Sequence, residues 1–468
     1  MKTINKIAKH LLRDKFFVFR NIIFKVVNSI INQKSGYVLT DFSNVNDLIN
    51  EEIDFILSFN KKLEVNRSNI ILSRLSHFEI FEFLFFLKEN GFSVFNQKGS
   101  KLSKHQFMSC VEACYISRRY YSTKGFLIYD YSDIKIHFKS ISYKNKSDIC
   151  EPEVDIVYTW VDGEDESWKI KKNNVLLDKL DVLPTSNIDS RYKSRDELKY
   201  SIRSIFLYAP WVRNIYIVTD EQIPSWFIES ERIKIIDHKE IFPDLNVLPV
   251  FNSHAIESCL HRIPGLSDFF LYLNDDVMLT RPCDKTDFFD FKNKKTKFFL
   301  STTTFVPETL TNTSLPVDIS AYNNLKLLHE NYNYTSNRKF QHTPIALSKS
   351  VLLKLELEHP DVFNTCRKNK IRSIDDYSIV SSLHHHYGII IKRSIESKIR
   401  YDYINLADKS AKHKLLYLLL CGYKRRPKVI CINDVDERFN QSDDIDIFLE
   451  KTLSNMYPYA SECERLLA

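Results

Sequence analysis

Short apolar runs that end in polar residues alternate with helical patterns over residues 155–276, and this alternation is the feature that most narrows the possible folds. The runs have the length of strands and lie at residues 155–160, 214–219, 233–236 and 269–273. The helical patterns lie at residues 198–209 and 253–263. Strands that alternate with helices form a mostly parallel sheet with helices on both faces. We therefore predict an α/β fold with a Rossmann-like sheet, and expect ligands at the carboxyl ends of its strands.

The scarcity of glycine excludes the glycine-rich phosphate loops. Among 468 residues there are 8 glycines, and the closest pair is Gly91 and Gly99. The dinucleotide turn G-x-G-x-x-G and the loop G-x-x-x-x-G-K-[ST] both need glycines within a few residues of each other. Any phosphate group must therefore be held by cations, arginines or helix amides instead.

The recognisable motifs begin near residue 151, where Glu151-Pro152-Glu153 has the composition of a boundary. We predict an N-terminal domain or extension that is α/β or mostly helical, a main domain and a C-terminal helix, at residues 1–150, 151–440 and 441–468. In the N-terminal part, the apolar run 72–87 predicts a helix, and residues 92–95 predict a short strand.

The charge balance and the lack of a long apolar run bear on location and partners. The net charge of +6 is small and does not require a nucleic-acid partner, so we expect none. No stretch reaches the roughly 18 apolar residues that span a bilayer, and basic residues interrupt any signal peptide. The nine cysteines are scattered, which is typical of reduced thiols, so we expect a cytoplasmic protein. Residues 1–34 are basic and amphipathic, and would lie on the inner face of the membrane or pack on the protein itself.

Two pairs of polar residues follow apolar runs and suit a metal ion. Asp275 and Asp276 follow the run 269–273, with Asn274 before them, and Asn433 and Asp434 follow the run 429–432. Carboxylate and amide oxygens are the ligands that Mg²⁺ prefers, and Mg²⁺ commonly bridges to phosphates. The alternative is that both pairs are turn residues that face water.

Other polar groups lie at expected helix starts. They are Arg191, Lys193 and Arg195 before the capping box 194–197; Asn252 and His254; and Arg372, Asp375 and Asp376. Basic side chains at a helix start can bind an anion, and a histidine there can bind substrate or orient an acid. The alternatives are a solvated basic loop and a structural histidine. His342 lies in a short polar segment, and His384–His386 are consecutive, so they cannot chelate one ion together.

The order of these segments resembles that of the Stealth family of capsular polysaccharide phosphotransferases. The similar segments are Asp155–Gly163 for the first signature block, Arg191–Asp220, Phe251–Ser258 and Leu271–Val277 for the second, Gln341–Pro344 and Arg372–Ser378 for the third, and Cys431–Asp434 for the fourth. They occur in family order and cover about residues 153–440. The family also includes the animal enzyme that tags lysosomal hydrolases with GlcNAc-1-phosphate.

The resemblance implies a glycosyltransferase-like fold and transfer of a hexose-1-phosphate, such as an N-acetylhexosamine-1-phosphate, from a UDP-sugar to a glycan or lipid-linked glycan hydroxyl. The products would be UMP and a phosphodiester-linked capsular polysaccharide, with Mg²⁺ or Mn²⁺ as cofactor. It implies a metal site at Asp275, Asp276, Asn433 and Asp434, diphosphate contacts from Arg191, Arg195 and Arg372, and a donor pocket lined by Asp162, Asn252 and His254. His342, Asp375 or Asp376 would take the acceptor proton.

Two other functions stay open. A metal-dependent glycosyltransferase would use a similar Asp pair, but would attack the sugar carbon and release UDP. A non-catalytic carbohydrate-binding protein would consume no nucleotide sugar. The residues before 151 would contact the acceptor, the membrane or partners in capsule assembly.

Overall fold

The computed structural model describes most of the chain after residue 151 and shorter segments before it. The described residues are 37–40, 53–61, 63–66, 69–72, 77–90, 92–95, 113–117, 119–122, 127–129, 135–137, 152–177, 195–304, 315–420, 425–433, 443–457 and 460–465. The chain divides into two compact units, Met1–Ile149 with Cys421–Arg425 and Cys150–Leu420 with Arg426–Ala468. The basic segment 1–34 lies outside the described residues, so its membrane contact stays a prediction.

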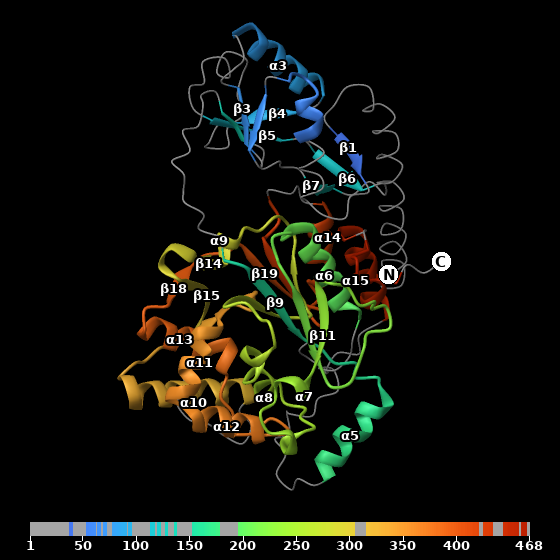
Figure 1. Ribbon diagram of the computed structural model, residues 1–468. Coiled ribbons are helices and arrows are strands. Elements are labelled where there is room, and N and C mark those ends of the chain that lie inside the picture. The colour runs from blue at the N-terminus through green and yellow to red at the C-terminus, as the bar shows by residue number, and fades with distance from the viewer. Residues whose placement is uncertain are drawn as a thin grey trace. The chain divides into compact units, whose positions relative to one another are not determined.

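The first unit contains two small sheets and the helix α3 (His77–Glu89) (Figure 1). One sheet has the order β1 (Tyr37–Thr40), β6 (Arg119–Ser122), β7 (Leu127–Tyr129). The other has the order β2 (Glu64–Asn66), β3 (Asn69–Ile71), β8 (Lys135–His137), β5 (Ala113–Ser117), β4 (Ser93–Phe95). The short strand predicted at 92–95 is confirmed as β4.

The prediction of a helix from residue 72 was wrong at its start. Ile70 and Leu72 are both fully buried, and the spacing of two is that of a strand with one face on the core. Residues 69–71 form β3, and α3 begins only at His77. Of the predicted run, Leu72 follows β3, and the part from His77 belongs to α3.

The second unit is built on a five-stranded sheet that confirms the predicted α/β fold. Its order is β11 (Ile233–Asp237), β10 (Ile215–Thr219), β9 (Val154–Thr159), β12 (Phe269–Asn274), β17 (Ile345–Ser348). The first four strands are parallel to their neighbours, and β17 is antiparallel to β12. Because Thr159 is opposite both Val218 and Asn274, the carboxyl ends of β9, β10 and β12 lie at one edge of the sheet.

Helices cover both faces of this sheet. On one face, α6 (Glu197–Tyr208) packs on β9, where Ser201 and Tyr158 share a hydrogen bond of 2.8 Å. On the other face, Val157 and Phe270 belong to a buried apolar cluster with residues of several helices. Four of these helices are α8 (Ser253–Glu257), α10 (Pro316–Tyr332), α11 (Lys349–Glu358) and α12 (Pro360–Lys368); α10–α12 gather on one side of Figure 1 together with α13 (His384–Ile390).

The predicted helix at 253–263 was wrong in its second half. Helix α8 ends at Glu257, and a separate 3-10 turn covers Leu260–Arg262. The buried guanidinium of Arg367 donates a 2.9 Å hydrogen bond to the carbonyl of Ser258, which a continuous helix would use for its own ladder. Arg262 instead donates its amide to the carbonyl of Cys259, three residues back.

Helix α6 begins at Glu197, one residue before the predicted helix. The carboxylate of Glu197 accepts a hydrogen bond from the amide of Arg195 at 2.5 Å, and Asp196 has a left-handed backbone with a φ of 62°. The predicted capping box was therefore wrong, because the N-cap of α6 is Asp196 and not Ser194, which lies outside the described residues.

Smaller sheets complete the second unit. One contains β13 (Val277–Leu279), β20 (Val429–Asn433) and β19 (Tyr401–Asn405); the other contains β14 (Phe289–Asp290), β15 (Lys295–Thr304), β16 (Arg338–Phe340) and β18 (Ser394–Ser397). The remaining helices are α5 (Glu166–Leu177), α7 (His238–Ile241), α9 (Lys285–Phe288), α14 (Ala411–Leu420) and α15 (Asp443–Met456). None of the helices in the described ranges is long and apolar enough to cross a membrane.

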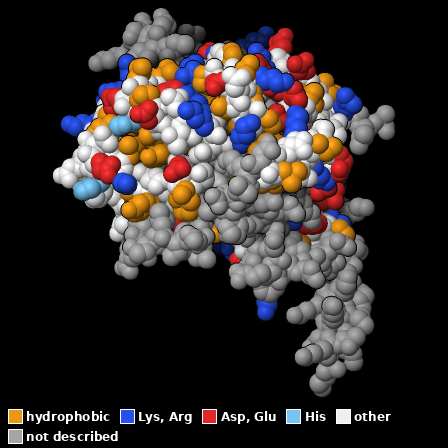
Figure 2. All heavy atoms as spheres, turned by 90° about the horizontal axis from the view of Figure 1, so that it is seen from below, with side chains coloured by type: hydrophobic (Ala, Val, Ile, Leu, Met, Phe, Trp, Pro, Cys, Tyr) orange, Lys and Arg blue, Asp and Glu red, His pale blue; other side chains and the backbone are white. Residues whose placement is uncertain are grey.

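Basic and acidic side chains are interspersed on the described part of the face seen in Figure 2. This mixture agrees with the small net charge of +6.

Candidate functional site

Asp276 lies at the turn between β12 and β13, at the edge where the strands of the main sheet end. Its carboxylate accepts hydrogen bonds from the Nδ2 of Asn433 at 2.8 Å and from the thiol of Cys431 at 3.3 Å. Both residues belong to strand β20. This strand pairs antiparallel with β13, and Cys431 lies opposite Val277, the residue after Asp276, so the pairing brings both side chains to the Asp276 carboxylate. The pairing therefore brings together the two polar strand ends, at 274–276 and 433, that the sequence singles out.

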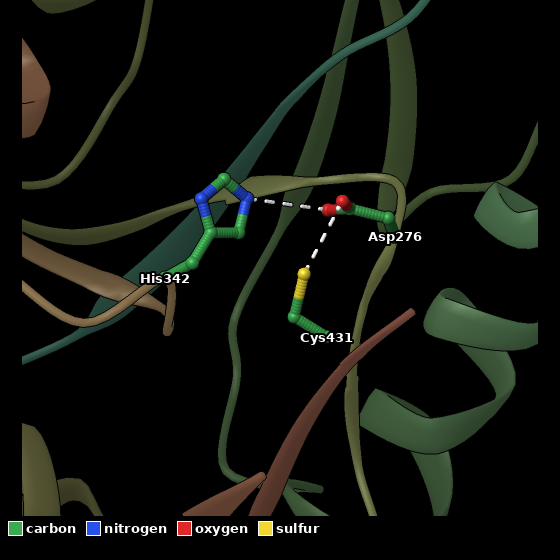
Figure 3. Close-up of side chains that lie close together, drawn as sticks. All are labelled: Asp276, His342 and Cys431. Atoms are coloured by element: carbon green, nitrogen blue, oxygen red, sulfur yellow. Dashed lines mark hydrogen bonds and ion pairs between the residues drawn. The ribbon is translucent and has the colours of Figure 1, made fainter. Parts of the chain in front are cut away.

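His342 reaches the same carboxylate from the segment between β16 and β17 (Figure 3). Its Nε2 lies 3.4 Å from Oδ1 of Asp276 and 3.0 Å from the side-chain amide nitrogen, Nδ2, of Asn274. The His342 side chain is 41% exposed, whereas that of Asp276 is 13% exposed, so the site opens to solvent on the histidine side. Partial desolvation of the imidazole disfavours protonation of His342, but the nearby negative charges, chiefly that of Asp276, outweigh it and raise the pKa of His342.

Asp275, Asp276 and Glu197 form an acidic group. Burial raises the pKa of Asp275 well above its usual value, and the charges of Glu197 and Asp276 raise it further. Burial also raises the pKa of Glu197, although the hydrogen bond from the Arg195 amide acts in the opposite direction and lowers it. Carboxylates held this close in a partly dry site favour either protons or a bound cation.

The residues present fit a hard divalent cation. Oδ1 of Asp276 is buried and makes no hydrogen bond, so one carboxylate oxygen is left for a ligand. Asp275 and Asn433 offer further oxygens of the kind that Mg²⁺ prefers. Asp434, also predicted to bind the metal, lies outside the described residues.

Cys431 is a site residue that the sequence prediction did not assign. Cys431 and Asn433 are two residues apart on one strand and therefore project from the same face of β20. That spacing was the signal that could have identified the thiol beside Asn433. Its partner Asp276 is 155 residues away in the chain, so only the strand pairing brings the two together.

Glu257 is the second missed residue. It ends α8, is 5% exposed, and accepts a hydrogen bond from the Tyr272 hydroxyl at 3.3 Å, while its Oε2 makes none. Burial raises the pKa of Glu257. Its charge also contributes to the raised pKa of His342, which places the carboxylate within electrostatic range of that imidazole.

Asp376 is the centre of a buried hydrogen-bonded group at the start of α8. The carboxylate accepts from the side chain of Asn252 at 2.9 Å, from that of Asn369 at 2.8 Å and from the amide of Ser373 at 2.9 Å. Nδ1 of His254 is 3.3 Å from the same carboxylate. The group joins the predicted residues Asn252, His254 and Asp376 and fixes the helix start.

Arg372 lies beside this group and is only part-buried. Its Nη2 donates a 2.9 Å hydrogen bond to Ser253, and its positive charge lowers the otherwise raised pKa of Glu257. Asp375, three residues along, is exposed. A guanidinium with an exposed part near an acidic group can accept an anionic substrate.

The remaining predicted residues lie elsewhere or outside the described ranges. Asp162 is in the turn after β9, where its carboxylate accepts from the Glu164 amide at 2.9 Å. The Nε of Arg195 donates to Asp446 of α15 at 2.7 Å. Arg191 and Lys193 lie outside the described residues, so the anion site remains a prediction.

The three consecutive histidines are buried in the core. Nε2 of His384 accepts from the Ser348 amide at 3.2 Å, and His386 shares a hydrogen bond of 3.2 Å with Tyr334. Burial lowers the pKa of all three imidazoles, to about 3 for His384 and about 4 for His386. Burial therefore favours the neutral form of all three, and they pack in the core.

The sheet and the acidic strand end define an α/β protein with a group of acidic side chains at the carboxyl edge of its main sheet. Residues 191–298 match conserved region 2 of the Stealth proteins, and residues 341–389 match conserved region 3. The chain belongs to the Stealth family, as its sequence blocks predict.

Its relatives are exopolysaccharide and capsular polysaccharide phosphotransferases. The chain is 41% identical to SCO6023 of Streptomyces coelicolor over 67% of this chain and 52% of that protein. It is 30% identical to SacB of Neisseria meningitidis serogroup A over 80% of this chain and 65% of that protein. The chain thus spans about half the length of several curated relatives that it matches.

Among solved structures, galactosyltransferase LgtC with donor and acceptor sugar analogs matches 66% of this chain and 98% of its own. The TM-score is 0.33 and the identity 9%.

Proposed function

We propose that the protein transfers a hexose-1-phosphate from a UDP-sugar to a hydroxyl of a glycan acceptor and releases UMP. The observation that carries this proposal is the Asp276–His342 pair: a buried carboxylate oxygen that makes no hydrogen bond lies 3.4 Å from a partly exposed imidazole. The relatives are named phosphotransferases of exopolysaccharide or capsular polysaccharide, which supports transfer of a phosphate-linked unit.

His342 acts as the general base in this proposal. Its Nε2 takes the proton of the acceptor hydroxyl while the hydroxyl oxygen bonds to the β-phosphorus, and the bond from that phosphorus to the bridging oxygen breaks. Asp276 stabilises the imidazolium that forms. Asp376 is a weaker candidate for the base because its oxygens already accept several hydrogen bonds.

Arg372 and the acidic residues have separate tasks. The guanidinium of Arg372 contacts the diphosphate as a charged hydrogen-bond donor. Asp275, Asp276 and Asn433 would hold Mg²⁺ or Mn²⁺, which when bound neutralises charge on the phosphoryl oxygens. The UDP-sugar donor, a lipid-linked acceptor and contacts at the inner membrane face all belong to this proposal.

The released nucleotide tests the reaction. Purified full chain is incubated with UDP-N-acetylglucosamine and other UDP-sugars, Mg²⁺ and a capsular oligosaccharide, and the nucleotide product is identified. UMP supports sugar-1-phosphate transfer, UDP would show glycosyl transfer, and saccharide binding without nucleotide release would show a binding protein.

Matched variants link the activity to the site. Asp276→Asn and His342→Gln should each lower UMP release by about 100-fold or more, because general base catalysis alone contributes about 10²- to 10⁴-fold. Asp408→Asn and His413→Gln change exposed residues of the same types and should retain full activity. Full activity in both site variants would refute the assignment.

A further inference from the structure

The candidate site contains three chemically different metal ligands. An oxygen of Asp276, a ring nitrogen of His342 and the sulfur of Cys431 all lie within 4.8 Å of one another (Figure 3). Oδ1 of Asp276 is 3.4 Å from Nε2 of His342, and Oδ2 of Asp276 is 3.3 Å from the sulfur of Cys431. Magnesium binds oxygen ligands and has little affinity for sulfur, so the thiol adds nothing to a magnesium site.

The spacing of these atoms suits zinc. Protein ligands lie about 2.0–2.1 Å from Zn²⁺ when nitrogen or oxygen binds and about 2.3 Å when sulfur binds, in a tetrahedral arrangement. Two such ligands are then roughly 3.4–3.6 Å apart. The distances from Asp276 to His342 and to Cys431 are close to these values, although they involve different oxygens of the carboxylate. Because all three ligand atoms lie within 4.8 Å of one another, a small movement of the side chains completes the zinc geometry.

A second observation also points to a ligand. Asp276 is buried, and its Oδ1 is a buried oxygen without a hydrogen bond. Leaving a buried carboxylate oxygen unpaired costs free energy, which a bound cation would offset. That oxygen is the one nearest to His342, so the unpaired atom and the imidazole face the same point.

We propose that Asp276, His342 and Cys431 bind Zn²⁺ as three protein ligands with a fourth position open to solvent, and that this zinc inhibits the enzyme. On binding, the thiol releases its proton to solvent and the sulfur bonds to the metal. Zinc enters from the side of His342, the exposed member of the three. The inhibition, which rests on the proposed function, follows because zinc occupies the Nε2 that must accept the acceptor proton.

Binding is tested without any turnover by using Co²⁺ as a spectroscopic substitute for Zn²⁺. The full chain titrated with Co²⁺ should show a thiolate-to-cobalt charge-transfer band in the near ultraviolet, and added Zn²⁺ should abolish it. Cys431→Ser should lose the band. His342→Gln removes a proposed ligand itself. It should therefore weaken cobalt binding by more than the roughly 10- to 100-fold that is typical when a residue that only hydrogen-bonds to a metal ligand is lost.

Control variants locate the signal. Cys283→Ser and Cys463→Ser change buried thiols elsewhere in the second unit and should keep the band. The double variant Cys110→Ser/Cys114→Ser removes the closely spaced pair in the N-terminal part and should also keep it. Thermal melts of Cys431→Ser check its folding; a folded variant that retains the band, or a wild-type chain without one, overturns the proposed site.

The activity measurement separates the two proposals. Zn²⁺ at a concentration that saturates the cobalt-binding site should reduce UMP release more than tenfold in the presence of excess Mg²⁺, and a chelator should restore it. A zinc-saturated chain with undiminished UMP release overturns the inhibition. A chain that shows the cobalt band but releases no UMP even without zinc contradicts the proposed function and leaves the zinc site intact.

Discussion

The side-chain amide of Asn433 donates a 2.8 Å hydrogen bond to the carboxylate of Asp276, 157 residues earlier in the chain. This bond orients the carboxylate so that Oδ2 is occupied and Oδ1 faces His342. Asn433 therefore sets which oxygen of Asp276 is available for a cation.

The first prediction concerns this orientation. Asn433→Ala should lower UMP release by about 10- to 100-fold and raise the Mg²⁺ concentration needed for half-maximal activity, because a freed Asp276 no longer presents Oδ1 in one direction. Rates measured against Mg²⁺ concentration test it. An unchanged magnesium dependence would show that Asn433 does not orient the carboxylate.

The second prediction concerns binding of the donor. Arg372→Ala should raise KM for the UDP-sugar by at least about tenfold, since a charged hydrogen bond contributes about 1.5–3 kcal/mol. Arg372→Lys should recover only part of the loss, because an ammonium cannot reproduce the planar fork of a guanidinium. Initial rates against donor concentration separate KM from kcat. Arg338→Ala removes an exposed arginine and serves as control; an equal effect there would contradict the prediction.

The third prediction assigns a structural role to a charged residue of the first signature block. Asp155 is fully buried, and its two oxygens accept hydrogen bonds from Arg213 at 2.8 and 2.6 Å and from the amide of Ser267 at 2.7 Å. Arg213→Ala should lower the free energy of unfolding by about 3–5 kcal/mol, because it leaves a buried carboxylate without its cationic partner.

A neighbouring ion pair of the same arginine is the control. Nη1 of Arg213 also contacts Glu153 at 2.7 Å, but Glu153 is 59% exposed. Glu153→Ala should therefore change the free energy of unfolding by no more than roughly 1 kcal/mol. Urea denaturation measures both variants, and similar losses in the two would contradict the structural role of Asp155.

The fourth prediction is an acid-sensitive stability that arises from His384, His385 and His386. Their pKa values are lowered in the folded protein, so below about pH 6.5 the unfolded chain binds protons that the folded chain does not. Their stabilising contribution is thus fully present above about pH 6.5. It falls as the pH drops toward 4, by about 1.4 kcal/mol per pH unit for each histidine.

His385→Phe tests this pH dependence. The imidazole of His385 packs against the rings of Phe298 and Phe340, with centroids 5.7 and 5.2 Å away, so an aromatic replacement suits its surroundings. The free energy of unfolding of the variant should depend less steeply on pH between 6 and 4.5, whereas the exposed control His413→Gln should follow the wild type. Parallel curves for wild type and His385→Phe would contradict the assignment.

The strands of the main sheet could be predicted because their signal is local. The apolar runs at 155–160, 214–219, 233–236 and 269–273 each coincide with a strand to within about one residue. A fully buried parallel strand must be apolar along its whole length, and it ends where polar residues begin. The Asp275–Asp276 turn could be identified for the same reason.

The elements that were mispredicted depend on partners far away in the chain. The predicted helix at 253–263 is interrupted because Arg367, over a hundred residues later, donates a hydrogen bond to the carbonyl of Ser258. Cys431 is a site residue only because β20 pairs with β13. The two-residue spacing places Cys431 on the same side of the strand as Asn433, but no local pattern shows that the distant partner of either element is Asp276 or Arg367.

The pairing of β13 with β20 also has a consequence for protein synthesis. A ribosome makes Asp276 and His342 long before it makes Cys431 and Asn433, which lie on the last strand described in the chain. A nascent or prematurely terminated chain that lacks this strand therefore holds the histidine and the aspartate without the residue that orients them. Translation order thus delays a complete centre until β20 has emerged and paired.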